Sequence, residues 1–117
     1  MQFSVVYTVT LFVATASMAS ATVYQGIRTG VDGSTSQVAW TNGTPDPCSL
    51  FTKIVDGTGS PCGQDFFVDG GNGPFRLLNC GVGDPVLERG GEFNAVCKYE
   101  PTTINCPNSH IQQNWFC

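Results

Sequence analysis

Short apolar stretches alternate along the chain with clusters of glycine and polar residues, and no segment shows sustained helical periodicity. Apolar runs of this length between turn-forming residues are typical of β-strands. The pattern therefore predicts a mainly β protein. The predicted strands are Thr22–Arg28, Gln37–Thr41, Leu50–Val55, Asp65–Val68, Phe75–Cys80, Glu92–Tyr99 and Ile111–Phe116.

The segment Glu92–Tyr99 has the clearest alternation, which predicts one half-buried strand. Its two faces are Phe93, Ala95, Cys97 and Tyr99 against Asn94, Val96 and Lys98. The segment that follows, from Pro101 to Cys117, is more irregular. A short helix over Ser109–Asn114, capped by Ser109, is the alternative there to a strand.

Tight turns are predicted where Val-Asp-Gly occurs, at residues 31–33, 55–57 and 68–70, and where Gly90 and Gly91 are adjacent. Asp-Gly and Gly-Gly pairs favour the positive φ values of the turns that join antiparallel strands. We therefore expect a small antiparallel β-sandwich or barrel. The loops Thr41–Pro47, Asp69–Pro74 and Pro101–His110 are the segments most suited to carry function.

The first 21 residues contain no charged side chain, and an apolar stretch leads there to the small residues Ala19, Ser20 and Ala21. This is the pattern of a signal peptide, residues 1–21, followed by a single disulfide-rich β domain, residues 22–117. A membrane anchor is the alternative, but a span needs about 20 predominantly apolar residues. Six serines and threonines interrupt this one: Ser4, Thr8, Thr10, Thr15, Ser17 and Ser20. We therefore expect a secreted, extracellular protein.

All six cysteines follow Ala21, and an even number behind an export signal predicts three disulfides. They are Cys48, Cys62, Cys80, Cys97, Cys106 and Cys117. Pairing cannot be deduced from sequence, since six cysteines allow 15 connectivities. We favour nearest neighbours: Cys48–Cys62, Cys80–Cys97 and Cys106–Cys117. A zinc site is disfavoured because no two cysteines have close metal-ligand spacing.

The net charge of −4 is spread along the chain without a run of either sign. An acidic protein without a basic stripe is a poor match for nucleic acid, where phosphate contacts dominate affinity. The same charge argues against anionic membrane surfaces. We expect a monomer that neither binds nucleic acid nor inserts stably into membranes.

Few side chains suggest catalysis. His110, the only histidine, could act with Glu88, Glu92 or Glu100 and with an arginine, Arg76 or Arg89, as in small ribonucleases. Two carboxylate pairs could serve a glycosidase, Asp65 with Asp69 and Glu88 with Glu92. No spacing selects these partners, and the chain has little material for a substrate cleft. We therefore predict no catalytic residue.

Oxygen ligands for calcium could come from Asp65, Asp69 and Asn72, although the EF-hand pattern is incomplete. Turn formation accounts for the same residues, so we predict no metal and no cofactor. Asn42, in Asn42-Gly43-Thr44, is a glycosylation sequon in a loop rich in glycine and proline.

Aromatic residues are the remaining candidates for a contact surface. Phe66 and Phe67 are adjacent, so on a strand they must point to opposite faces. Most aromatic side chains of so small a domain fill its core, but exposed ones are enriched at binding hot spots. The candidate binding surface consists of Trp40, Phe67, Asn72 and Trp115.

The signal Met1–Ala21, the short chain after it, the six cysteines ending at Cys117 and the missing catalytic signature resemble the small secreted cysteine-rich proteins of fungi. Many of those proteins are effectors of plant pathogens. The resemblance is architectural and covers the whole chain, so no functional residue can be carried over. It implies a non-enzymatic effector or elicitor that binds a host or cell-wall partner, protein or glycan. The alternatives are a glycan-binding or protease-inhibitory module, or a small ribonuclease or hydrolase.

Export should remove Met1–Ala21 and leave Thr22 as the first residue, because small residues precede that bond. N-terminal sequencing of the exported protein measures this directly. A secreted chain that retains Met1 would contradict the predicted signal peptide.

Overall fold

A computed structural model describes residues 22–117, so the predicted signal peptide lies outside the described residues. This part of the chain consists of strands, turns and loops, without a helix. The strands are β1 (Val23–Thr29), β2 (Thr35–Thr41), β3 (Thr52–Asp56), β4 (Phe66–Val68), β5 (Asn72–Leu78), β6 (Val86–Arg89), β7 (Glu92–Val96), β8 (Lys98–Asn105) and β9 (His110–Phe116).

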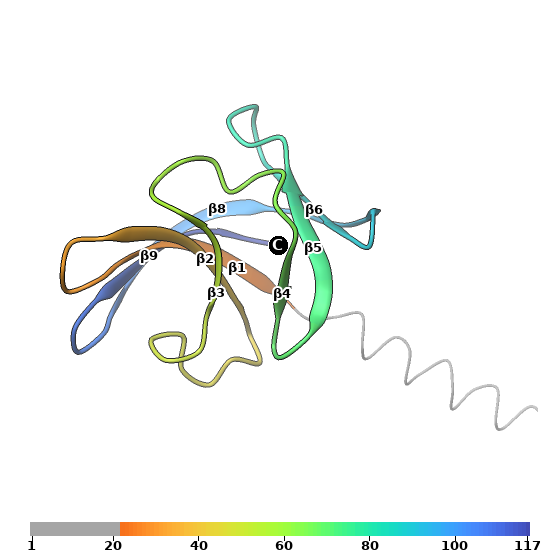
Figure 1. Cartoon of the computed structure of the whole chain (residues 1–117). Helices are drawn as coiled ribbons and strands as arrows, with labels where there is room; N and C mark the ends of the chain where they lie inside the picture. Colours follow the sequence, from red (N-terminus) through yellow and green to blue (C-terminus); the bar gives the residue numbers. More distant parts are fainter. Residues whose placement is uncertain (1–21) are drawn as a thin grey trace, which may run out of the picture.

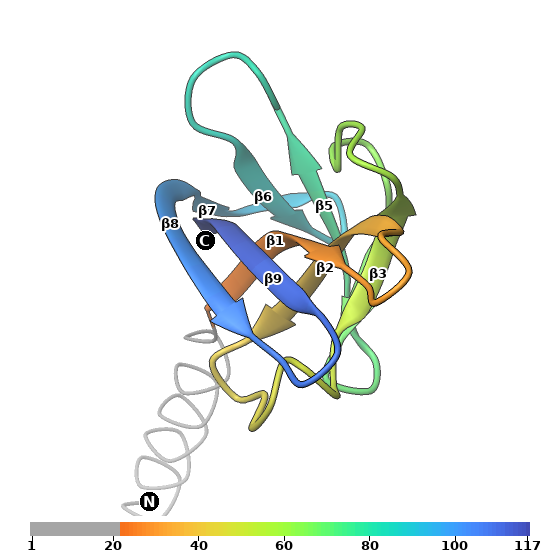
Figure 2. The same ribbon diagram turned by 90° about the vertical axis from the view of Figure 1, so that its left-hand side faces the viewer.

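The strands form two antiparallel sheets that pack face to face, with the strands of one running across those of the other (Figures 1 and 2). The five-stranded sheet has the order β3-β2-β1-β9-β8, and the four-stranded sheet has the order β4-β5-β6-β7. The prediction of a mainly β fold is therefore confirmed, in its sandwich form and not as a closed barrel.

The main core lies between the two sheets. The alternation of side chains along each strand places Val23 and Ala39 of the five-stranded sheet opposite Phe66, Leu77 and Leu87 of the other. In β4 the two adjacent phenylalanines point to opposite faces, as predicted. Phe66 is buried, whereas Phe67 is 50% exposed on the outer face.

A second, smaller core covers the outer face of the five-stranded sheet. Val38, Trp40 and Ile111 are buried there, and Phe51 of the loop between β2 and β3 packs against them. The Tyr24 ring stacks on Trp40 with 5.8 Å between centroids. Strand β2 is thus covered on both faces, which explains why its residues are buried almost without alternation.

Three of the four predicted turns join neighbouring strands. Residues 31–33 connect β1 to β2, residues 69–71 connect β4 to β5, and Gly90 and Gly91, both with positive φ, connect β6 to β7. In the first turn, hydrogen bonds from the Ser34 hydroxyl and backbone N–H hold the pKa of Asp32 below its ordinary value.

The turn at residues 55–57 is the exception, and its prediction as a hairpin is wrong. Gly57 has the expected positive φ, but its N–H donates to Thr35 O and the chain leaves for the other sheet. A local Asp-Gly signal fixes the bend without fixing which strand comes next.

Two further expectations about secondary structure are wrong, and one strand was not predicted. Glu92–Tyr99 is not one strand, because the chain passes from the four-stranded to the five-stranded sheet at the buried Cys97. Ser109–Asn114 is not a helix, since pairing of β9 with both β1 and β8 outweighs the local cap signal. Strand β6 has no counterpart among the predicted strands.

The nearest-neighbour pairing of cysteines is also wrong, although all six are bonded as expected. The disulfides are Cys48–Cys106, Cys62–Cys80 and Cys97–Cys117. Cys106 and Cys117 stand at opposite ends of β9, about 20 Å apart at the rise of a strand, which is beyond disulfide reach. Strand β6 likewise separates the strands that precede Cys80 and Cys97.

Three disulfides within one chain indicate folding in an oxidising environment. Each one ties together segments distant in sequence. Cys48–Cys106 fastens the loop between β2 and β3 to the β8–β9 turn, and Cys62–Cys80 joins the loops that follow β3 and β5.

Trypsin distinguishes this connectivity from the nearest-neighbour scheme, because the five basic residues separate the cysteines almost completely. Without reduction, we expect one linked species of residues 29–53, 90–98 and 99–117, and another of residues 54–76 and 77–89. Mass spectrometry of the digest measures both. A species that links residues 29–53 to residues 54–76 would contradict the structure.

Candidate functional site

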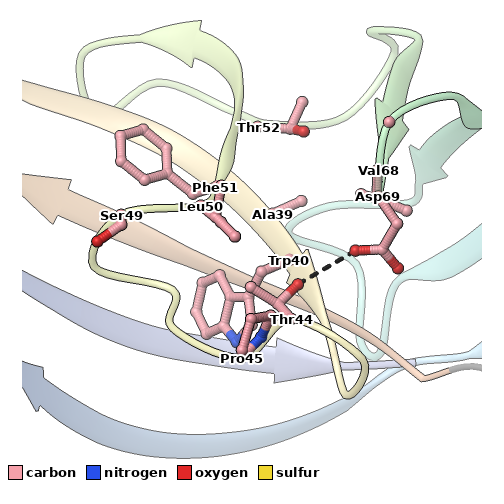
Figure 3. A pocket seen from close by; sticks show the side chains of 11 residues that line it. Ala39, Trp40, Thr44, Pro45, Ser49, Leu50, Phe51, Thr52, Val68 and Asp69 are labelled. Atoms are coloured by element: carbon pink, nitrogen blue, oxygen red, sulfur yellow. Dashed lines mark hydrogen bonds between the residues drawn. The ribbon is translucent and has the colours of Figure 1, made fainter.

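A cleft of about 300 Å³ opens between the loop that follows β2 and the β4–β5 turn (Figure 3). We call it the Trp40 cleft. Its lining comes from β2, from the loop before β3 and from the β4–β5 turn. The lining residues are Ala39, Trp40, Thr44, Pro45, Ser49, Leu50, Phe51, Thr52, Val68, Asp69 and Gly70.

One wall of the cleft is apolar. Trp40 is only 5% exposed and is fixed by its stacking on Tyr24, whereas Leu50 is 56% exposed at the mouth. Phe51 has the Arg28 guanidinium 4.9 Å from its ring centroid. The Arg28 Nε is the one sealed side-chain polar atom in residues 22–117 without a hydrogen-bond partner, and the ring offers the guanidinium a favourable cation–π contact.

The opposite rim is polar and rigid, because Asp69 is held by Thr44 (Figure 3) and by Thr41. The Thr41 hydroxyl donates to Oδ2 at 2.5 Å, and the Thr44 hydroxyl donates to Oδ1 at 3.2 Å. Asp69 itself has a φ of 50°, which is uncommon for a residue other than glycine. The carboxylate is thus fixed at the cleft by hydrogen bonds from a distant loop.

Thr44 also closes the end of β2 on the side of β3, because β3 pairs with β2 only as far as Ala39, whereas β1 pairs with Thr41 on the other side. The Thr44 hydroxyl accepts the Thr41 N–H at 3.1 Å, and the Thr44 N–H donates to Thr41 O at 3.0 Å. A threonine side chain therefore supplies the contacts that a neighbouring strand would otherwise make. These contacts fix the loop that follows β2 in the position where it forms one wall of the cleft.

A second, smaller pocket of about 210 Å³ shares Val68 and Asp69 with the cleft. Asn72 and Arg89 line its far side, and the Arg89 guanidinium lies 5.4 Å from the Phe75 ring centroid. Arg89 forms no ion pair within residues 22–117, whereas Asp69 stands between the two hollows. The site therefore has the Asp69 carboxylate between the two pockets and the Arg89 guanidinium, without an ion-pair partner in residues 22–117, in the smaller pocket.

The four residues predicted as a binding surface do not form one surface. Trp40 lines the cleft and Asn72 its neighbour, so these two come close to each other. Phe67 lies on the outer face of β4, and Trp115 lines a different pocket. Exposed and buried aromatics cannot be told apart from sequence in a domain where both sheet faces carry apolar residues.

Two of the predicted functional loops meet here, since Thr41 and Thr44 of one contact Asp69 of the other. The third, Pro101–His110, is half strand β8, and only residues 106–109 form a turn between β8 and β9. The sequence carried no signal for Leu50 as part of the cleft wall. Turn-forming residues around Thr44 and Asp69 were the only sign that could have located the rim.

The residues considered for catalysis or calcium are dispersed. His110 begins β9 in the five-stranded sheet, while Glu88 and Glu92 belong to β6 and β7 of the other sheet (Figures 1 and 2). Asp65 pairs with Arg76 at 2.8 Å and not with Asp69. Within the described part of the chain, no three His, Cys, Asp or Glu side chains gather as metal ligands.

Asn42, the sequon residue, is exposed beside the cleft, and its Oδ1 accepts the Thr22 N–H at 3.3 Å. The third residue of the sequon, Thr44, supports Asp69 in the folded protein. Glycosylation of Asn42 stays a prediction, placed on the same side of the molecule as the Trp40 cleft.

Replacement of Thr44 by valine should lower the free energy of unfolding by about 1–2 kcal/mol, because Thr41 N–H and Asp69 each lose a partner. Urea unfolding measures the loss, and hydrogen exchange at the Thr41 amide should become faster. Thr58→Val is the matched control, since Thr58 is exposed and makes no side-chain hydrogen bond within residues 22–117. Unchanged exchange at Thr41 would contradict the capping role.

Comparison with known proteins identifies no relative: no family model, no curated protein and no solved structure matches this chain. Residues 22–117 also contain no helix that could span a membrane.

Proposed function

We propose that the protein is a secreted, non-enzymatic binding protein of the effector or elicitor type, and that the Trp40 cleft is its main contact site. The observation that carries the proposal is a preformed cleft of about 300 Å³ in a small cross-linked domain. Hollows of this size with apolar walls and a few fixed polar groups are the usual form of binding sites.

Rigidity supports binding as the role of the cleft. One wall is tied down by Cys48–Cys106, and the other is tied to it through Asp69 and the two threonines. Side chains and loops that are already ordered lose little conformational entropy when a partner binds. The same cross-links favour persistence outside the cell, in accord with the signal peptide predicted for residues 1–21.

The lining indicates the chemistry of the partner. Asp69 is the one charged side chain in the cleft, and the remaining wall is largely aromatic, aliphatic or proline. A protein segment with a basic side chain beside an apolar one would satisfy both halves. The net charge of −4 attracts such a segment from a distance.

Panning of a random peptide display library on the immobilised protein tests the proposal. Selected peptides should place lysine or arginine beside an aromatic or aliphatic residue. They should bind Asp69→Asn about 10- to 100-fold more weakly, because a charged hydrogen bond contributes about 1.5–3 kcal/mol. Leu50→Ser should weaken binding as well, by removing apolar contact at the mouth.

Asp84→Asn and Val82→Ser are the controls, since the first makes the same change as Asp69→Asn and the second also replaces an aliphatic residue by serine, both at exposed positions of the β5–β6 loop. Both should bind the peptides as the wild type does. Selected peptides that bind all four variants equally would refute the cleft as the contact site, and so would a library that yields no binder.

A further inference from the structure

A separate pocket of about 310 Å³ is lined by the loops that follow β3 and β5. Those loops lie at the opposite end of the sandwich from the β4–β5 turn (Figure 1). Cys62–Cys80 ties those two loops together. None of the pocket's lining residues is charged. They are Gln25, Gln37, Thr58, Gly59, Ser60, Pro61, Cys80, Gly81, Pro85, Asn114 and Trp115.

Two glutamines form the floor of this pocket, and they lie almost entirely inside the sandwich. Gln25 is 1% exposed and Gln37 is 4% exposed. The Gln25 amide donates to Gln37 Oε1 at 2.5 Å and to Gly26 O at 3.0 Å, and the Gln37 amide donates to Gly59 O at 2.6 Å. Each amide therefore orients the other.

This network leaves one acceptor atom and one N–H of the two amides without a protein partner. Gln25 Oε1 accepts no hydrogen bond within residues 22–117, and the second N–H of Gln37 donates none. Gln25 Oε1 is not sealed from solvent, since Arg28 Nε is the one sealed side-chain polar atom without a partner in residues 22–117. Because both side chains line the pocket, one acceptor and one donor remain available to a ligand there.

Their burial is difficult to explain by stability alone. The neighbouring positions on the same sheet face, Val23 and Ala39, are apolar core residues. An amide removed from water costs free energy that its hydrogen bonds only offset, whereas an apolar side chain of equal size would gain from burial. Two adjacent amides inside the sandwich are therefore better explained by a polar ligand.

A β-bulge brings two further residues into the pocket. Gln25 pairs with Trp115 while Gly26 pairs with Gln113, so Asn114 is an extra residue in β9. Adjacent residues of a regular strand face opposite sides, but across the bulge Asn114 and Trp115 both line the pocket.

Glycine at position 26 makes this bulge possible. A Cβ atom there would lie 2.5 Å from Gln112 O, in the backbone of β9. The half-buried Trp115 is held in turn by Tyr99, edge to face, with 5.2 Å between centroids. Local irregularity and aromatic packing thus combine to fix an amide and an indole side by side.

We propose that this pocket binds a neutral saccharide unit. Sugar hydroxyls donate and accept at once, which matches the free acceptor of Gln25 and the free donor of Gln37. The apolar face of a sugar ring can pack on Trp115, and the absence of charge from the lining disfavours ionic ligands. The pocket is independent of the peptide site proposed above.

The two tryptophans of the chain provide the readout, one for each site. The full exported, disulfide-bonded protein, labelled with ¹⁵N, is titrated with soluble oligomers of glucose, N-acetylglucosamine, mannose and galactose. At least one oligomer should shift the Trp115 indole N–H and the Gln37 amide resonances, while the Trp40 indole resonance stays in place. If no oligomer moves Trp115, or if shifts gather at Trp40, the proposal is wrong.

The double variant Gln25→Met with Gln37→Met separates binding from structure. Replacement of both hydrogen-bond partners by apolar groups of similar shape can be nearly neutral for stability. The exposed Gly59 O that loses the Gln37 amide can bond water instead. We therefore expect a folded protein with a similar melting temperature, together with sugar binding weakened about tenfold or more. Gln112→Met, in β9 but outside the pocket lining, is the matched control.

Asn114→Ala provides a second variant at the surface of the pocket, in case the double variant does not fold. It should weaken the same sugar while leaving the Asp69-dependent peptide binding intact. Equal sugar affinity in wild type and in the folded pocket variants would overturn the proposal, and so would a selected peptide that displaces the sugar from Trp115.

Discussion

The link between Cys97 and Cys117 is the constraint on which the rest of the structure depends. At Cys97 the chain passes from the four-stranded to the five-stranded sheet, and its side chain is fully buried between them. Its partner, Cys117, exchanges two backbone hydrogen bonds with Val23, at 2.8 and 3.1 Å. One covalent bond therefore fixes the end of β9, the start of β1 and the corner where the sheets meet. A chain this small buries a limited share of its surface, so such a link supplies a large part of its stability.

The other two disulfides act outside that frame, each beside one of the proposed sites. Cys48–Cys106 holds the loop that forms one wall of the Trp40 cleft, and Cys62–Cys80 holds the loops above the pocket lined by Gln25 and Gln37. Loops without such links would have to be ordered by each ligand at a cost in conformational entropy. Cys97–Cys117 thus stabilises the scaffold, and each of the other two disulfides stabilises the loops of one site, at opposite ends of the sandwich.

Local signals in the sequence predicted the strands and most turns, because alternation and Gly-Gly or Asp-Gly pairs act over a few residues. Strand β6 was not predicted, because only two of its four residues are apolar and it ends in Glu88 and Arg89, next to a glycine turn. The disulfide pairing depended on that missing strand, so it could not follow from sequence order. Trp40 was a candidate contact residue from the sequence, but its burial could not be predicted, since it depends on a loop folded over the outer face of its sheet.

Several residues with an unfavourable conformation or unexpected burial lie at the Trp40 cleft and at the pocket lined by Gln25 and Gln37. Asp69 takes a positive φ at the rim of the cleft, although glycine would adopt it with less strain. Gln25 and Gln37 occupy interior positions that apolar side chains would fill more favourably, and Gly26 forgoes a side chain in the middle of a central strand. Proteins keep such local conflicts chiefly where function requires them. The presence of such positions at both sites supports the proposals that each site binds a ligand.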